Sequence, residues 1–292
     1  MAGFGEAIAY GAVTIINAIS IEKGAALGAD LWTKARVQLN KEAGIVKGRI
    51  LSDPREDTTL MKESVSRVLK HFQSDKEYGA YVETESNIPI AKGLKSSSVA
   101  ANAIILATLA AFGRQLNDVD IIGLGVDASV SAKTTITGAF DDACASFFGN
   151  VVITDNLKRR ILKRYEVKTD FLILFHVPDQ KSYTFTSNVK RMKIIAPYVE
   201  VAFREAFSGN YWTALTLNGI LYAVALGYEP KIAMDALSAG AKASGLSGKG
   251  PATAAIVPKR DVNKIIDAWR QYGGTIIKAK INRKKARILR KK

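Results

Sequence analysis

The sequence predicts an α+β fold in two domains. Strand-like and helix-like segments follow one another irregularly along the 292 residues, so the strict strand–helix alternation of a doubly wound sheet is missing. The composition, 48% apolar and 24% charged, is that of an ordinary globular chain, and the length is sufficient for two domains. We expect the boundary near residues 150–168 and assign residues 1–155 to an N-terminal domain and residues 156–292 to a C-terminal domain with a basic tail.

The N-terminal part begins with strands and then becomes helical. Strands are expected from β-branched content or alternating apolar residues, and helices from apolar residues three and four positions apart. The expected strands are residues 13–20, 31–39, 45–51 and 78–90, and the expected helices are 59–72, 97–112, 118–133 and a segment that ends near 148.

The C-terminal part starts with an apolar strand, F-L-I-L-F-H-V at residues 171–177. Helices with short strands between them follow, which again indicates an α+β arrangement. The expected helices are residues 195–207, 212–225, 231–241 and 262–272, and the expected strands are 252–257 and 275–279.

The loop before the longest apolar helix has the composition of a phosphate site. From Pro89 to Ala103 it reads P-I-A-K-G-L-K-S-S-S-V-A-A-N-A, with a glycine and three serines directly ahead of the helix. The first N–H groups of a helix have no partner within it, and the helix dipole adds positive charge there, so this end favours an anion. Lys95 adds a movable cation. Serines are also frequent helix caps, so this loop alone does not decide between the two interpretations.

Two further loops indicate related chemistry. Thr137–Ala143 reads T-G-A-F-D-D-A, with paired carboxylates after a glycine, and Leu246–Val257 contains a second glycine loop, S-G-K-G-P, before an apolar strand. Adjacent residues on a helix point roughly 100° apart, so Asp141 and Asp142 should have different roles.

Taken in order, the patterns P-x3-G-L-x-S-S, T-G-x-x-D-D-A and S-G-x-G-P resemble the three signatures of the GHMP small-molecule kinases, over most of the chain. Within that superfamily, Gly11–Leu31 and Gly138–Gly149 resemble the archaeal type of shikimate kinase. The resemblance implies an N-terminal ribosomal-protein-like domain and a C-terminal ferredoxin-like domain. It also implies phosphorylation of the 3-hydroxyl of shikimate with ATP and Mg²⁺, with homoserine or mevalonate as alternative acceptors.

The resemblance implies roles for residues of the first and third loops. Ser97 is at the position that contacts Mg²⁺ in the family. The family's G-L-G-S-S-A is altered here, because Lys95 replaces the second glycine and Ser98 replaces the alanine. The residues expected to bind ATP are Pro89, Lys92, Gly93, Leu94, Lys95, Ser96, Ser97, Ser98, Ser247, Gly248, Lys249 and Gly250.

The second loop would carry the reaction. The resemblance places Asp141, with one extra residue after the glycine, where a carboxylate accepts or orients the proton of the substrate hydroxyl. Asp142 either contacts the substrate or caps the following helix. In the family, a Mg²⁺-binding carboxylate usually precedes this loop, and Asp127 is the nearest candidate. The alternative is that Asp127 is simply a solvated residue on a helix. The remaining substrate candidates are polar residues of the small-residue N-terminal segment: Asn17, Lys23 and Asp30.

The formal net charge is +15, and basic runs lie at residues 158–164 and 278–292. Such runs either bind nucleic acid through its phosphates or form solvated surface and a frayed tail, and we favour the second interpretation. A positive field would also attract ATP and an anionic substrate, so charge does not separate a kinase from an RNA-binding protein. An RNA-binding protein would not need the three loops together.

Composition also bounds the location and the partners. Cys144 is the single cysteine, which excludes an internal disulfide and favours a reducing cytoplasm. Two histidines and one cysteine make a His/Cys metal centre very unfavourable. The longest uncharged apolar stretch, residues 99–112, is shorter than the roughly 20 residues that span a bilayer. Glu6 interrupts the apolar N-terminus, unlike a signal peptide. We expect ATP and a small anionic hydroxylated substrate as partners, and no membrane.

Overall fold

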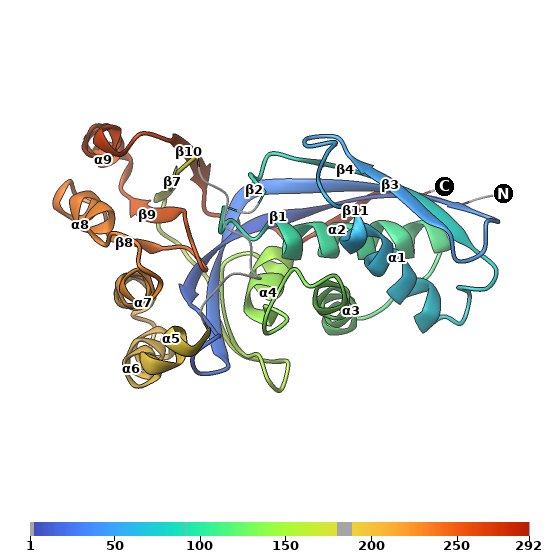
Figure 1. Cartoon of the computed structure of the whole chain (residues 1–292), viewed down its shortest axis with the longest axis horizontal. Helices are drawn as coiled ribbons and strands as arrows, with labels where there is room; N and C mark the ends of the chain where they lie inside the picture. The colour runs from blue at the N-terminus through green and yellow to red at the C-terminus, as the bar shows by residue number, and fades with distance from the viewer. Residues whose placement is uncertain (1–2, 91, 180–188, 292) are drawn as a thin grey trace.

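The chain forms two β-sheets, each covered by helices (Figure 1). The structure is a computed structural model and describes residues 3–90, 92–179 and 189–291. The larger sheet has the strand order β11-β1-β2-β4-β3, with β5 and β6 attached beside β2, and the smaller sheet has the order β10-β7-β9-β8. This arrangement confirms the predicted α+β fold in two domains.

The strands of the larger sheet come from both ends of the chain. All of its pairings are antiparallel except that of β3 with β4. Its strands are β1 (Phe4–Ile16), β2 (Lys23–Asn40), β3 (Val46–Ile50), β4 (Gly79–Ser86), β5 (Val151–Asp155), β6 (Arg160–Tyr165) and β11 (Arg287–Lys291).

Four helices cover one face of the larger sheet (Figure 1). The central one, α2, packs on β1 and β2 and against the other three helices. It is apolar on all sides and buried along most of its length, as expected for a helix enclosed by other elements. These helices are α1 (Thr59–His71), α2 (Ser96–Phe112), α3 (Asp118–Ser131) and α4 (Phe140–Phe148).

The surroundings of β2 change along its length, and this change positions the site. Residues 24–29 are buried at every position, where α4, α6 and β10 contact the strand. From residue 30 onward, buried and partly exposed side chains alternate, because here one face meets the helices and the other faces solvent. The first half of β2 therefore lies inside the molecule, beneath α4.

In the described part of the C-terminal unit, five α-helices pack with the smaller sheet. In β7, Ile173 and Phe175 belong to the main core, whereas Leu172 and Leu174 belong to a second core with Trp269. Both faces of β7 are therefore covered, which explains its uninterrupted apolar sequence. The elements are β7 (Leu172–Val177), α5 (Val189–Ile194), α6 (Ala196–Phe207), α7 (Tyr211–Leu226), α8 (Lys231–Ser238), β8 (Ala243–Leu246), β9 (Thr253–Val257), α9 (Val262–Trp269) and β10 (Thr275–Lys280).

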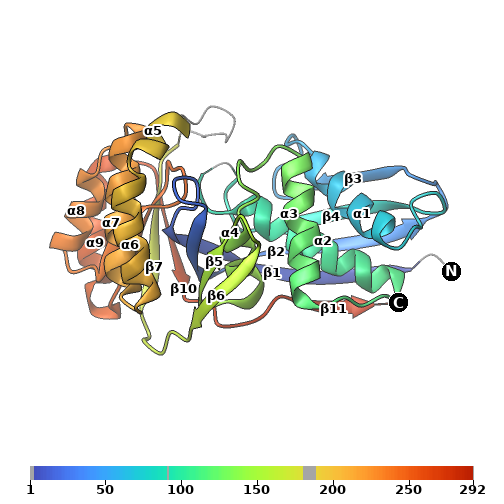
Figure 2. The same cartoon turned by 90° about the horizontal axis from the view of Figure 1, so that it is seen from below.

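The basic C-terminal segment is not the frayed tail that the sequence predicts. Residues 275–280 form β10, and residues 287–291 form β11, which pairs with the outer edge of β1. Between them, Ile281 and Ala286 are buried. Side chains in β11 are exposed, and a short, basic edge strand of this kind resists pairing with other chains. Figures 1 and 2 place both chain ends at the end of the larger sheet away from the smaller one.

The basic run at residues 158–164 also belongs to the larger sheet, because β6 pairs with β5. Its side chains are mostly exposed, in agreement with the predicted solvated surface. The domain boundary expected after residue 155 thus falls inside the β5–β6 hairpin. The strands β6 and β11 belong to the N-terminal sheet, although the sequence predicts residues 156–292 to be the second domain. Among the described residues, no helix has the length and apolarity needed to cross a membrane.

Candidate active site

A cavity of about 490 Å³ lies where the N-terminal helices approach the loop before β9. Segments far apart in the sequence line it: the turn after β1, the loops before α1 and α2, the connection from α3 into α4, and the loop before β9. Its volume suits a small-molecule ligand. The three loops selected from the sequence therefore meet at one cavity.

The loop before α2 presents the N-terminus of that helix to the cavity. Lys95 is the cap residue, with φ of +65°, and its side chain makes no capping hydrogen bond. Ser96, Ser97 and Ser98 form the first turn, line the cavity and have no acidic neighbour in that turn. The first-turn N–H groups are therefore well placed to bind an anion.

The third loop is docked onto the first loop and onto β1. Gly93 has φ of +81°, and a Cβ atom at this position would lie 2.5 Å from the carbonyl oxygen of Ser247. The hydroxyl of Ser247 donates to the carbonyl oxygen of Gly93 at 2.9 Å. The N–H of Gly248 donates to Oγ1 of Thr14, also at 2.9 Å. Gly93 is required here because two backbone segments approach each other so closely.

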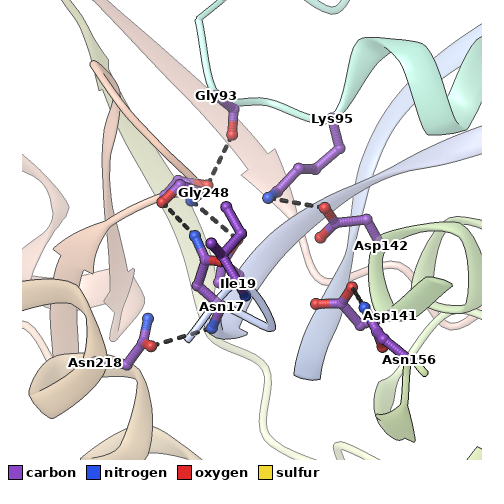
Figure 3. Close-up of polar contacts among 11 residues, drawn as sticks. Asn17, Ile19, Gly93, Lys95, Asp141, Asp142, Asn156, Asn218 and Gly248 are labelled. Atoms are coloured by element: carbon purple, nitrogen blue, oxygen red, sulfur yellow. Dashed lines mark hydrogen bonds and ion pairs between the residues drawn. The ribbon is translucent and has the colours of Figure 1, made fainter. Parts of the chain in front are cut away.

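Charged side chains of the first, second and third loops meet at the cavity, and Figure 3 shows Lys95 directed at Asp142. Nζ of Lys95 lies 2.9 Å from Oδ2 of Asp142, and both side chains are about 10% exposed. Oδ1 of Asp142 has no hydrogen-bond partner among the described residues. Burial lowers the pKa of Lys249 to about 7; repulsion from Lys95 adds to the effect and Asp142 opposes it. An arriving phosphate or carboxylate would favour the protonated amine.

Asp141 is buried in the first turn of α4 and lines the cavity. Its Oδ1 accepts a hydrogen bond of 2.8 Å from Nδ2 of Asn156. Burial, and then repulsion by Asp142, raise its pKa to about 7, while Lys95 and the hydrogen bond from Asn156 act in the opposite direction. A carboxyl group with this pKa is partly ionised at neutral pH and basic enough to accept a hydroxyl proton.

Asn17 lies in the cavity wall, but its side chain is used to hold the third loop. Its Nδ2 donates to the carbonyl oxygen of Gly248 at 2.9 Å, and its backbone N–H donates to Oδ1 of Asn218 at 3.0 Å. The hydroxyl of Tyr222 donates to the carbonyl oxygen of Asn17 at 3.1 Å. The turn after β1 is thus fixed between α7 and the third loop.

Three predicted residues are not brought to the cavity. Oδ1 of Asp127 accepts a hydrogen bond of 2.6 Å from Arg159, so a guanidinium occupies the carboxylate that we expected to bind Mg²⁺. Nζ of Lys23 lies 3.3 Å from Oε1 of Glu200 on α6. Asp30 is half-buried on β2, at the residue from which buried and partly exposed side chains alternate. None of the three lines the cavity, and the structure does not bring Asp127 to the other predicted site residues.

Two residues of the first loop also differ from expectation. Nζ of Lys92 donates to the carbonyl oxygens of Pro178 and Asp179, beyond the end of β7, and is not directed at the cavity. Pro89 does not line the cavity, whereas Leu94 is a buried core residue at its wall. Lys92 and Leu94 thus hold the loop in place, and the residues that line the cavity follow them in the sequence.

The structure adds residues that the sequence analysis missed. Gly24 on β2 supports Asp141, since a Cβ atom there would lie 2.4 Å from Oδ2 of Asp141. The small residue at this position leaves space that the Asp141 carboxylate fills. Glu56, Asp57, Thr134 and Thr135 also line the cavity, and no local motif marks them.

We expect Gly24→Ala to displace the Asp141 carboxylate and lower turnover by up to about 10²-fold, because misplacement of a reacting group by 1 Å can cost that much. Steady-state ADP release would measure the loss. Gly123→Ala is the control, since no atom lies within 4 Å of a Cβ atom there. Unchanged turnover in Gly24→Ala would mean that the position of Asp141 is unimportant.

The described residues provide no cluster of three or more His, Cys, Asp or Glu side chains for a metal ion. Ser97, at the first turn of α2, remains the protein group that could contact such an ion.

Comparison with known proteins agrees with this geometry. The sequence model "GHMP kinases N terminal domain" matches residues 60–150, and "GHMP kinases C terminal" matches residues 203–275. A protein from Methanococcoides burtonii named shikimate kinase is 47% identical over 280 residues, 95% of this chain and 96% of the relative. One of the same name from Pyrococcus furiosus is 41% identical, over 91% of this chain and 95% of the relative.

Solved structures show the same fold at low identity. A homoserine kinase from Cytophaga hutchinsonii superposes with a TM-score of 0.75 at 17% identity, over 98% of this chain and 97% of the other. The Methanococcus jannaschii mevalonate kinase superposes with a TM-score of 0.77 at 13% identity, over 95% and 98%. Fold and site together define a small-molecule kinase that uses ATP. The chain belongs to the GHMP kinases and, within them, to the family of the shikimate kinases named above.

Proposed function

We propose that the protein transfers the γ-phosphoryl group of ATP to the 3-hydroxyl of shikimate, giving shikimate 3-phosphate and ADP. The observation that carries this proposal is the meeting of an uncapped helix N-terminus, two lysines and a buried carboxylate at one cavity. The relatives named shikimate kinase match almost the whole chain, which supports shikimate as the acceptor. The convergence of all three loops favours a kinase over the RNA-binding alternative.

The residues of the cavity fall into two groups with different tasks. The first turn of α2, with Lys95 and Lys249, would hold the phosphates and offset the charge that spreads over the transferring group. Mg²⁺, when bound with ATP, adds to this neutralisation, and Ser97 would contact it. Asp141 would take the proton of the acceptor hydroxyl as the new bond to phosphorus forms.

The test is an ADP-release assay with shikimate, homoserine and mevalonate as separate acceptors. We expect turnover with shikimate and none above background with the other two. Turnover with homoserine or mevalonate instead would overturn the acceptor and keep the kinase. Absence of ADP release with all three, together with salt-dependent RNA binding, would favour the RNA-binding alternative.

We propose a cytoplasmic location for this reaction. Cys144 is a buried free thiol, which suits a reducing compartment.

Ser97→Ala should lower turnover at saturating Mg-ATP by about tenfold or more, because it removes a group expected to contact the metal or the phosphates. The thermal midpoint should hardly change, since the hydroxyl caps no helix. Ser96→Ala is the matched control in the same turn and should lose less. Wild-type turnover in Ser97→Ala would contradict the assignment of this loop.

A further inference from the structure

Asp141 is held from behind by two side chains that the reaction described above does not use. Nδ2 of Asn156 donates to Oδ1 of Asp141 at 2.8 Å, and Oδ1 of Asn156 accepts from Oγ1 of Thr154 at 2.6 Å. All three residues are buried. An ionised carboxylate can only accept, so the amide nitrogen faces Asp141 and the amide oxygen faces the Thr154 hydroxyl, which donates to it.

The backbone fixes this arrangement. The N–H of Asn156 donates to the carbonyl oxygen of Glu22 at 2.8 Å, and Thr154 pairs with Gly24 in the ladder of β5 and β2. The same two strands therefore supply the amide that binds Asp141 and the glycine against which the carboxylate packs.

The hydrogen bond from Asn156 distinguishes the two carboxylate oxygens. Oδ1 is engaged, and Figure 3 shows the other oxygen pointing away from Asn156, toward the side on which Asn17 and Ile19 lie. Both of those residues line the cavity. Oδ2 lies against Gly24 and is not bound by Asn156, and Asp141 itself lines the cavity, so Oδ2 is the oxygen assigned to the acceptor hydroxyl.

Titratable groups approach Asp141 from three elements. Asp142 and Cys144 share α4 with it, Lys95 comes from the loop before α2, and Tyr222 comes from α7. Asp142 raises the pKa of Asp141 and Lys95 lowers it. The hydrogen bond from Asn156 also lowers the pKa of Asp141, because an uncharged donor stabilises the ionised carboxylate.

We propose that Asn156, oriented by Thr154, is a positioning residue for phosphoryl transfer. It binds one oxygen of Asp141, directs the other toward the acceptor hydroxyl, and stabilises the ionised carboxylate that takes the proton. This inference rests on the proposed function, because it assigns Asn156 a part in that reaction.

The experiment compares turnover of the full-length protein across pH. Asn156→Leu keeps the shape of the side chain and removes the amide. We expect turnover at pH 7 to fall at least about tenfold, with the midpoint of the acidic limb raised by roughly one pH unit, since a hydrogen bond to a charged group is lost. The KM for ATP should stay near that of the wild type.

Thr154 gives a second pair of variants that decides the question if Asn156→Leu does not fold. Thr154→Val removes the hydroxyl without changing the shape, and should move turnover and the acidic limb in the same direction by a smaller amount. Thr154→Ser restores the hydroxyl and should restore both. A loss of turnover with an unmoved acidic limb, or a Thr154→Ser variant that behaves like Thr154→Val, would overturn the proposal.

A measurement without substrate separates this inference from the proposed function. A ¹³C NMR titration of the aspartate carboxyls, with the Asp141 signal identified by its loss in Asp141→Asn, reports the pKa of Asp141 in the free protein. Asn156→Leu should raise it, and an unchanged value would overturn the positioning role. Wild-type protein that releases no ADP with shikimate would overturn the proposed function, whatever the titration shows.

Discussion

Asp141→Asn should lower turnover with shikimate by about 10² or more, because the amide cannot accept the hydroxyl proton. The replacement keeps the size of the side chain and can still accept the hydrogen bond from Asn156. ATP affinity, measured calorimetrically, should stay within a few-fold, since the first turn of α2 and the two lysines hold the phosphates. An equal loss of ATP affinity would show that Asp141 binds nucleotide.

The same substitution should leave the protein at least as stable as the wild type. The pKa of Asp141 is raised in the folded state, so its contribution to stability is full below the unfolded pKa and is lost as pH rises through about 7. At pH 8 the wild type therefore carries an unfavourable buried charge that the amide lacks. A thermal midpoint at pH 8 that is unchanged or higher would exclude unfolding as the cause of lost turnover.

Asp142→Asn provides the internal control. Its carboxylate raises the pKa of Asp141 and pairs with Lys95, so the variant should cost less turnover and shift the acidic limb of the pH profile, which we expect near pH 7 in the wild type, to lower pH. If Asp142→Asn proves the costly change and Asp141→Asn is silent, our alignment of this loop is wrong by one residue. If neither matters, the reaction proceeds by positioning alone.

The fold class and the three loops could be predicted because their signals are local. A serine run before an apolar helix, a glycine before paired carboxylates, and S-G-x-G-P before a strand each depend on residues a few positions apart. Secondary structure could be predicted for the same reason: α2 and β9 each begin within one residue of the start that the sequence predicts.

The partners of the site residues could not be predicted, because they are set by contacts between distant segments. Asn17 has the polarity of a substrate ligand, yet its amide meets Gly248, and that contact exists only once β1 and the third loop are folded together. Gly24 and Asn156 are likewise brought to Asp141 only by the pairing of β2 with β5.

The C-terminal segment misled the sequence analysis for a related reason. Its high charge indicated a solvated tail, and the side chains of β11 are indeed exposed. Backbone pairing, buried residues such as Ala286, and hydrogen bonds and ion pairs of its basic side chains hold the segment, and a composition-based argument does not detect these contacts.

Deletion of residues 282–292 should therefore destabilise the protein, contrary to the expectation for a frayed tail. It removes the backbone partners of the Gly28 carbonyl (2.9 Å), the Asn150 N–H (2.8 Å) and the Phe147 carbonyl (2.7 Å). Each unsatisfied buried group costs about 1–3 kcal/mol, so we expect a loss of roughly 3 kcal/mol or more and a thermal midpoint lower by roughly 10 °C.

The shorter deletion of residues 287–292 is the matched control for this prediction. It removes β11 but keeps Asn282 and Ala286, and solvent can replace the lost partners at the edge of β1. We therefore expect a shift of only a few degrees in a thermal unfolding scan. Because Phe147 lies on α4, which also carries Asp141, the longer deletion should also lower turnover well before the protein unfolds. Equal midpoints for the two deletions would show that the connection before β11 contributes nothing to the fold.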